Sequence, residues 1–342
     1  MPNETAISGP HSVGALVDRA FRLYRAHWAP LLLTGAMFLV PFGLLNGLIS
    51  GSYSVDAFRV LGQLFTDPGR ATELNQQLAA SRPPAPLLLL QYVMLLLSDG
   101  LSRLALAAFC VDTLLGRPTS VIGAVRTALR RLGAYFGMLF SGGCLVLTVC
   151  TMAIVPAFGV MFGFFLLAAG LGQLQSGDFS TLMALAVGML FLVGFLLGMA
   201  VVFGPLVYLM SRWIAALTGM LHRGWGPIEA LRNSWGLTRG LVWRTVAFYL
   251  VVTALLYVVE FTLGILTFLP ALLLPAAVSG VALGATSAAV QVILRPIGAA
   301  AVALYYFDLL VRKESFDLAL RVEQLEAALP PTVSGEDLPL AG

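Results

Sequence analysis

The chain has 342 residues, of which 59% are hydrophobic and only 11% are charged, with a net charge of +3. A typical soluble domain is about half apolar and about one quarter charged, so these side chains could not cover the surface of a soluble protein of this size. The composition therefore excludes an ordinary soluble enzyme, a disulfide scaffold and a disordered chain. It predicts an all-α, polytopic bundle of transmembrane helices. The small, dispersed positive charge argues against nucleic-acid binding.

Six apolar runs are long enough for spanning helices, which need roughly 20 residues each. They cover 28–50, 86–115, 133–173, 182–221, 241–268 and 281–311. Residues 1–27 are predicted to be a cytoplasmic amphipathic segment, 28–312 a single transmembrane domain, and 313–342 a cytoplasmic helix followed by a disordered tail. Because no short apolar run with a cleavage site opens the chain, we expect an uncleaved first span.

Two of these runs exceed one span, which leaves two topologies to weigh. Turns at Pro156 and at Gly204-Pro205 would divide the third and fourth runs into hairpins and give eight spans. We prefer six spans built from long helices that are kinked at these prolines, because the extra turns place the arginines no better. The stretch 269–280, which contains Pro270 and Pro275, is expected to be a short re-entrant or interfacial piece.

The basic residues indicate the orientation. With the N-terminus inside, fifteen of the 20 lysines and arginines fall on cytoplasmic segments and three (Arg59, Arg70 and Arg82) on the first outer loop. The other two, Arg103 and Arg295, lie within spans. Since cytoplasmic loops are enriched in Lys and Arg, this distribution predicts that both termini are cytoplasmic in a bacterial inner membrane.

Three similar segments precede the first, third and fifth predicted spans: 12–25, 118–131 and 226–239. Each has apolar residues at helical spacing, arginines on the other face, and Ser or Pro suited to a helix start. Such helices suit the inner membrane surface, with their arginines toward lipid phosphates. The predicted phosphate contacts are Arg19, Arg22, Arg126, Arg130, Arg232 and Arg239. A threefold repeat of surface helix, span and span is one reading of this pattern.

Two motifs resemble a known family. Ala230-Leu-Arg-Asn-Ser-Trp-Gly-Leu-Thr-Arg-Gly-Leu-Val-Trp-Arg244 and Tyr306-Phe-Asp-Leu-Leu-Val-Arg-Lys-Glu-Ser-Phe-Asp317 are similar to the bacterial membrane-domain family named after glycerophosphoryl diester phosphodiesterase. Gly116–Ser120 and Ser12–Arg25 add to the resemblance, which extends over roughly Ser12 to Glu326. The tail departs from the usual pattern at Phe307, Leu310 and Ser315. The resemblance implies a multi-spanning domain in a lipid-linked context, here without the catalytic domain of some relatives.

Four charged residues fall within the predicted spans and form the candidate polar site: Asp99, Arg103, Glu260 and Arg295. Intramembrane charges usually face the bundle interior and mark functional sites. Asp99 and Arg103 are four residues apart on one helix face and can pair with each other. Glu260 and Arg295 can pair across helices or line a cavity, and Glu260 can alternatively lie at the outer interface. Structural pairing is the simpler reading of both pairs.

Weighed together, these features favour a non-enzymatic structural or accessory protein of the membrane, associated with anionic lipid head groups. The alternative is a small transporter or lipid-handling permease that uses the intramembrane charges. A partner membrane protein is a further option, and Asp308, Arg312 and their neighbours are either a helix-end charge cluster or a docking point. No catalytic residue, cofactor or metal ligand is expected, because no nucleophile–base set or known motif is visible.

Overall fold

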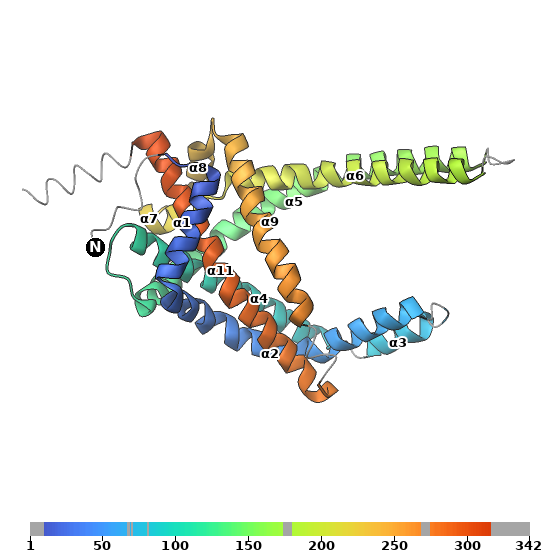
Figure 1. Cartoon of the computed structure of the whole chain (residues 1–342), viewed down its shortest axis with the longest axis horizontal. Helices are drawn as coiled ribbons and strands as arrows, with labels where there is room; N and C mark the ends of the chain where they lie inside the picture. The colour runs from blue at the N-terminus through green and yellow to red at the C-terminus, as the bar shows by residue number, and fades with distance from the viewer. Residues whose placement is uncertain are drawn as a thin grey trace, which may run out of the picture.

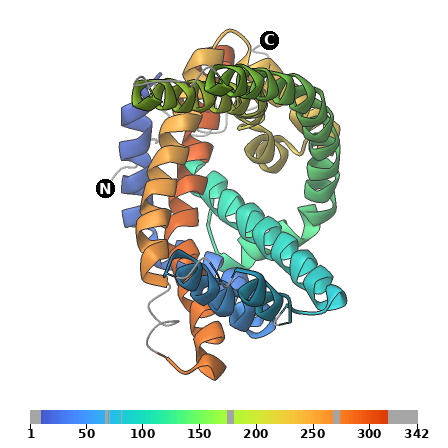
Figure 2. The same ribbon diagram turned by 90° about the vertical axis from the view of Figure 1, so that its right-hand side faces the viewer.

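The structure, a computed structural model, describes residues 10–66, 69, 71–80, 82–173, 180–267 and 274–315. It confirms an all-α polytopic bundle, and six of its helices are long and apolar enough to cross a membrane. The predicted C-terminal helix and tail beyond residue 315 lie outside the described residues. In Figures 1 and 2 the long pair α5–α6 projects away from the other helices, whereas α2, α4 and α11 pack together.

The first unit begins with a separate surface helix. Helix α1 (Val13–Ala26) is capped by Ser12, whose hydroxyl accepts the backbone N–H of Ala15 at 3.2 Å. Its apolar face is buried and it ends at His27, directly before α2 (Trp28–Thr66). Helices α3 (Ala71–Ala80) and α4 (Ala85–Leu114) follow.

Helix α2 is longer than the predicted first span. Its 39 residues extend about 58 Å at 1.5 Å per residue, whereas the hydrocarbon core of a bilayer is about 30 Å thick. The region between the first two spans, which we expected to be a loop, is therefore helical over the end of α2 and over α3.

The second unit is a long hairpin of two uninterrupted helices. Helix α5 (Val121–Gln173) and helix α6 (Ser180–Arg212) continue through Pro156 and Pro205, respectively, which confirms six spans and not eight. The pair projects far from the other helices (Figure 1). The second surface segment is not a separate helix, contrary to expectation: it forms the first turns of α5, which continues through Gly133 into the span.

The third unit again separates its surface helix from its span. After α6 come α7 (Ala216–Arg223), α8 (Pro227–Thr238), α9 (Val242–Thr267) and α11 (Ala276–Glu314). Gly240 ends the α8 segment with φ +82°, a conformation that favours glycine. The expected re-entrant piece lies partly at 268–273, outside the described residues, and Ala276–Gly280 is helical within α11. A threefold rotational relation between the units stays a prediction.

The core lies where α1, α4, α7, α9 and α11 meet. Tyr305, Tyr306 and Phe307 of α11 are almost fully buried, and the ring of Phe248 stacks on Tyr305 with 4.1 Å between centroids. The Tyr305 hydroxyl lies 2.8 Å from Thr245 Oγ1, and the Tyr306 hydroxyl lies 2.9 Å from His222 Nδ1. These contacts join the last turns of α11 to α9 and α7, and α1 and α8 also pack against α11 at this end of the molecule (Figure 1).

Candidate functional site

A cavity of about 320 Å³ lies among α2, α4 and α11. One part of its wall is apolar, with Leu39, Phe42, Tyr92, Leu95 and Leu96. Tyr92, Leu95 and Leu96 are exposed on the outside of the bundle, and Tyr92 is 66% exposed. Polar side chains complete the lining: Asn46, Ser98, Asp99, Ser287, Gln291 and Arg295.

Small residues bring α2 and α11 together beside the cavity. A Cβ atom added to Gly43 would lie 2.6 Å from the Ala288 Cβ, and one added to Gly47 would lie 2.7 Å from the Gly280 carbonyl oxygen. A Cβ on Gly284 would lie 2.8 Å from the Gly47 Cα. Close backbone contact through small residues is the usual way for membrane helices to associate without a hydrophobic driving force between them.

Three of the four predicted intramembrane charges come together at the polar wall. Arg103 Nε donates to Asp99 Oδ2 at 2.8 Å within α4, and Arg295 Nη1 of α11 donates to the other carboxylate oxygen. Arg295 also donates to Ser102 Oγ at 3.1 Å and to Gln291 Oε1 at 2.6 Å. One carboxylate thus faces two guanidinium groups, and the cluster carries a formal charge of +1.

Glu260 does not join this cluster. It is exposed on α9, and Arg295 pairs with Asp99 in its place. A Cβ on Gly298 of α11 would lie 3.0 Å from Leu256 of α9, so Glu260 lies one turn along α9 near the level of Arg295. Glu260 shares its face of α9 with Leu256, four residues earlier, yet it is exposed.

Two further polar groups of the cavity, Asn46 and Ser98, are hydrogen-bonded. Gln91 Nε2 donates to Asn46 Oδ1 at 2.6 Å, which joins α4 to α2. Ser98 Oγ donates to the Phe38 carbonyl oxygen at 3.3 Å. Sequence reasoning missed Asn46, Ser287 and Gln291, although Asn46 lies inside the Gly43–Gly47 spacing and Gln291 is one turn before Arg295. Uncharged polar residues close to a small-residue motif or to an intramembrane charge could have indicated these positions.

The predicted lipid-phosphate arginines lie on three separate elements. On α1, Arg22 is exposed and Arg19 is half-buried. Arg126 and Arg130 are exposed on the first turns of α5, and Arg232 and Arg239 are exposed on α8 and at its end.

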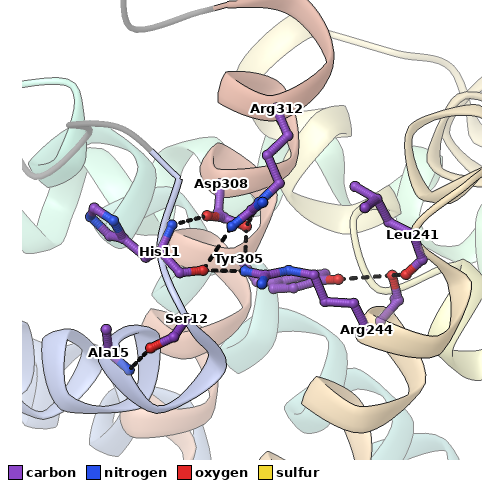
Figure 3. Close-up of polar contacts among 9 residues, drawn as sticks. His11, Ser12, Ala15, Leu241, Arg244, Tyr305, Asp308 and Arg312 are labelled. Atoms are coloured by element: carbon purple, nitrogen blue, oxygen red, sulfur yellow. Dashed lines mark hydrogen bonds and ion pairs between the residues drawn. The ribbon is translucent and has the colours of Figure 1, made fainter.

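A second ionic cluster joins the two motifs that resemble the family, and Figure 3 shows it in detail. Asp308 Oδ2 accepts hydrogen bonds from Arg244 Nη2 at 2.8 Å and from Arg312 Nε at 2.9 Å. Asp308 Oδ1 accepts the backbone N–H of His11 at 2.8 Å, and both arginines also donate to the His11 carbonyl oxygen. The predicted Asp308–Arg312 pair is present, but it belongs to a buried cluster that secures the start of α1.

Comparison with known proteins identifies no relative: no family model, no curated protein and no solved structure matches the chain. The site is therefore interpreted from its own chemistry, and the resemblance to the phosphodiesterase membrane-domain family stays a prediction.

Proposed function

We propose that this multi-pass membrane protein handles an anionic amphiphile, such as a lipid, in the cavity among α2, α4 and α11. The single observation that carries the proposal is the juxtaposition, in one cavity, of a lipid-facing apolar wall and the Asp99–Arg295 pair. This favours the permease or lipid-handling function over a purely structural role. No catalytic step is proposed.

The composition of the cavity supports an amphiphile. Ligand cavities are commonly about 300–1,000 Å³ and mostly apolar, with a few polar groups that orient the ligand. Here the apolar groups Tyr92, Leu95 and Leu96 suit a hydrocarbon segment, and the amides Asn46 and Gln291 suit a polar head group. The side chains of Asp99 and Arg295 are 30% and 25% exposed, so the ion pair is accessible.

The charge of the cluster supports an anion as the head group. Two guanidinium groups beside one carboxylate leave one positive charge to be compensated, and charges at membrane depth are costly without a partner. The planar guanidinium group binds phosphate or carboxylate through two parallel hydrogen bonds. An incoming anion can therefore bind to Arg295 while Asp99 stays paired with Arg103.

The orientation belongs to the same proposal. We place both termini in the cytoplasm of a bacterial inner membrane, with anionic lipid head groups against the basic surface helices. The gathering of α1, α7, α8 and the end of α11 at one end of the molecule supports this placement (Figure 1).

Native mass spectrometry of the full chain, extracted from its own membrane in mild detergent, tests the proposal. We expect a co-purified anionic amphiphile on the wild type and about tenfold less on Arg295→Gln, since a charge-assisted hydrogen bond contributes about 1.5–3 kcal/mol. Glu260→Gln is the matched control, because it removes an intramembrane charge that lies away from the cavity. Equal retention by both variants would contradict the proposal.

A second variant separates binding from folding. Ser287→Leu adds an apolar side chain to the cavity wall and leaves the ion pairs in place. We expect it to expel the amphiphile while its thermal unfolding stays near that of the wild type. If Ser287→Leu retains the amphiphile at the wild-type level, the cavity is not the binding site and a structural role is favoured.

A further inference from the structure

Arg212 is a buried cation without a carboxylate partner. It is the last residue of α6 and is only 3% exposed. Its Nε and Nη1 atoms are buried and make no hydrogen bond. Burial of an unpaired charge costs several kcal/mol in real proteins, so such a group normally has a counter-ion.

Aromatic rings surround this guanidinium group. Its central carbon lies 4.4 Å from the ring centroid of Trp235 on α8 and 6.0 Å from that of Tyr208 on α6. The two rings are 5.9 Å apart and nearly perpendicular, at 82°. A cation over an aromatic face gains about 0.5–2 kcal/mol, which offsets only part of the cost of burial. The stacking also leaves Nε and Nη1 of Arg212 without hydrogen-bond acceptors.

The backbone beside Arg212 is held in place by α8. Ser234 Oγ donates to the Arg212 carbonyl oxygen at 2.8 Å and accepts the backbone N–H of Ala215 at 3.2 Å. Both hydrogen bonds are buried, so Ser234 of α8 fixes the end of α6 in position. The position of Arg212 relative to α8 is therefore well defined.

Further positive charge lies on the same side of α8. Arg232, Trp235 and Arg239 are spaced three and four residues apart, which places them on one helix face. Both arginines are exposed. Within residues 180–259 the only acidic residue is Glu229, whose carboxylate caps the start of α8 and contacts Asn233.

Other arginines of this region have carboxylate partners. Arg223 pairs with Glu314, and Arg244 pairs with Asp308. Among the described residues, no ion pair joins Arg212, Arg232 or Arg239 to a carboxylate. The buried Arg212 thus lacks a counter-charge, and the exposed Arg232 and Arg239 add positive charge beside it. A phosphate group carries about −1.5 to −2 charges at neutral pH and can supply it.

We infer that the α6–α8 junction, formed by Arg212, Trp235 and Arg239, binds a phosphate group that the fold itself does not supply. The site lies away from the cavity among α2, α4 and α11, and it does not depend on the function proposed there. Tyr208 and Trp235 are the amphipathic aromatic residues typical of the head-group level of a bilayer. Because Trp235 covers the guanidinium of Arg212, phosphate binding displaces its indole ring.

The phosphate can belong to a lipid head group or to a free anion, and one titration distinguishes them. The full chain in uncharged detergent is titrated with dihexanoyl phosphatidylglycerol, with dihexanoyl phosphatidylcholine and with inorganic phosphate, and tryptophan fluorescence is followed. Trp235→Phe identifies the signal of this indole. A response to phosphatidylglycerol alone assigns the site to an anionic lipid. A response to inorganic phosphate as well assigns it to phosphate in general.

Three variants decide whether the site exists. We expect Arg212→Gln to weaken binding about tenfold, as a lost charge-assisted contact implies. Arg130→Gln, which removes an exposed arginine on α5, and Arg295→Gln, which alters the cavity, are expected to leave the affinity within about twofold. Absence of any response, or equal affinity of Arg212→Gln and Arg130→Gln, would overturn the inference.

Arg239→Gln keeps the test decisive if Arg212→Gln does not fold. Arg239 is exposed, so its removal leaves the packing of α6 on α8 unchanged. We expect about threefold to tenfold weaker binding of the ligand that the wild type binds, with an unchanged unfolding temperature. Unchanged affinity in this variant would overturn the inference, because Arg239 is one of the three residues that form the proposed site.

Discussion

Two aspartates, Asp99 and Asp308, each pair with two arginines, but their surroundings differ. The Asp308 side chain is 2% exposed and also accepts a backbone N–H, so its oxygens are used within the protein. The Asp99 side chain is 30% exposed and borders a cavity. The first cluster is therefore suited to stability, and the second is suited to exchange of its partners with a ligand.

Removal of the Asp308 carboxylate should destabilise the protein strongly. Asp308→Asn leaves Arg244 and Arg312 without their counter-charge at a nearly buried position, for which about 3–5 kcal/mol is the expected cost. Thermal unfolding in detergent measures the effect. Asp18→Asn on the exposed face of α1 is the control and should stay within about 0.5 kcal/mol of the wild type. Equal unfolding temperatures would contradict a structural role of the cluster.

The charge cluster at Asp99 should respond asymmetrically to mutation. Asp99→Asn leaves two guanidinium groups unpaired, whereas Arg295→Gln leaves Asp99 paired with Arg103. We expect Asp99→Asn to cost about 1–2 kcal/mol more than Arg295→Gln, and the double variant to recover part of this loss. Unfolding by a graded denaturing detergent reports these differences. Additive effects of the two substitutions would rule out direct coupling.

Among the helices, the contact between α2 and α11 depends most on small residues. Gly43, Gly47, Gly280 and Gly284 allow their backbones to touch, and the same contact shapes the cavity. Two other pairs have the same spacing. A Cβ on Gly198 would lie 2.5 Å from Met161, so the Gly194–Gly198 pair packs α6 against α5, whereas nothing lies within 4 Å of a Cβ on Gly159 or Gly163. Spacing alone does not identify a contact.

Alanine at these positions should have opposite effects. A Cβ at Gly284 would overlap the Gly43 carbonyl oxygen, so Gly284→Ala should force α2 and α11 apart and cost about 1–3 kcal/mol. Gly163→Ala meets open space within α5 and should be neutral or stabilising by up to about 1 kcal/mol, because alanine favours helix. The two unfolding temperatures, measured side by side, check this. A neutral Gly284→Ala would contradict close backbone contact.

At the level of the molecule, the α5–α6 pair projects away from a body in which α2, α4 and α11 pack together (Figures 1 and 2). One end of this body holds α1, α7, α8 and the ion pairs of Asp308 and Glu314. Helix α3 and the far ends of α5 and α6 lie away from that end (Figure 1). Ionic contacts thus stabilise one end, while apolar helix faces at the other remain available to lipid.

The orientation can be checked by cysteine labelling in intact cells. After replacement of Cys110, Cys144 and Cys150, an impermeant maleimide should label Gln77→Cys on α3 without permeabilisation. It should label Arg232→Cys on α8 only after the membrane is opened, because the excess of arginines predicts that α8 is cytoplasmic. The reverse pattern would invert the topology, and labelling of both sites in intact cells would contradict the six-span arrangement.

Much of the fold follows from local composition. Apolar runs of bilayer length predict the spans, and Ser12 and Pro227 mark the starts of α1 and α8. Spanning helices tolerate proline, so α5 and α6 continue through Pro156 and Pro205. The pairs Asp99–Arg103 and Asp308–Arg312 were also predictable, because a helix always brings residues four apart onto one face. These features depend on neighbours in the chain.

The site itself depends on contacts between distant segments. Asp99 meets Arg295 across 196 residues, and His11 meets Asp308 across 297. Packing between helices determines which charges are enclosed, so Arg295 reaches the cavity while Glu260, at a similar level of α9, stays exposed. That packing depends here on the glycines between α2 and α11, and local periodicity cannot predict it. Composition therefore determines that the chain spans a membrane, and packing determines which of its charges meet.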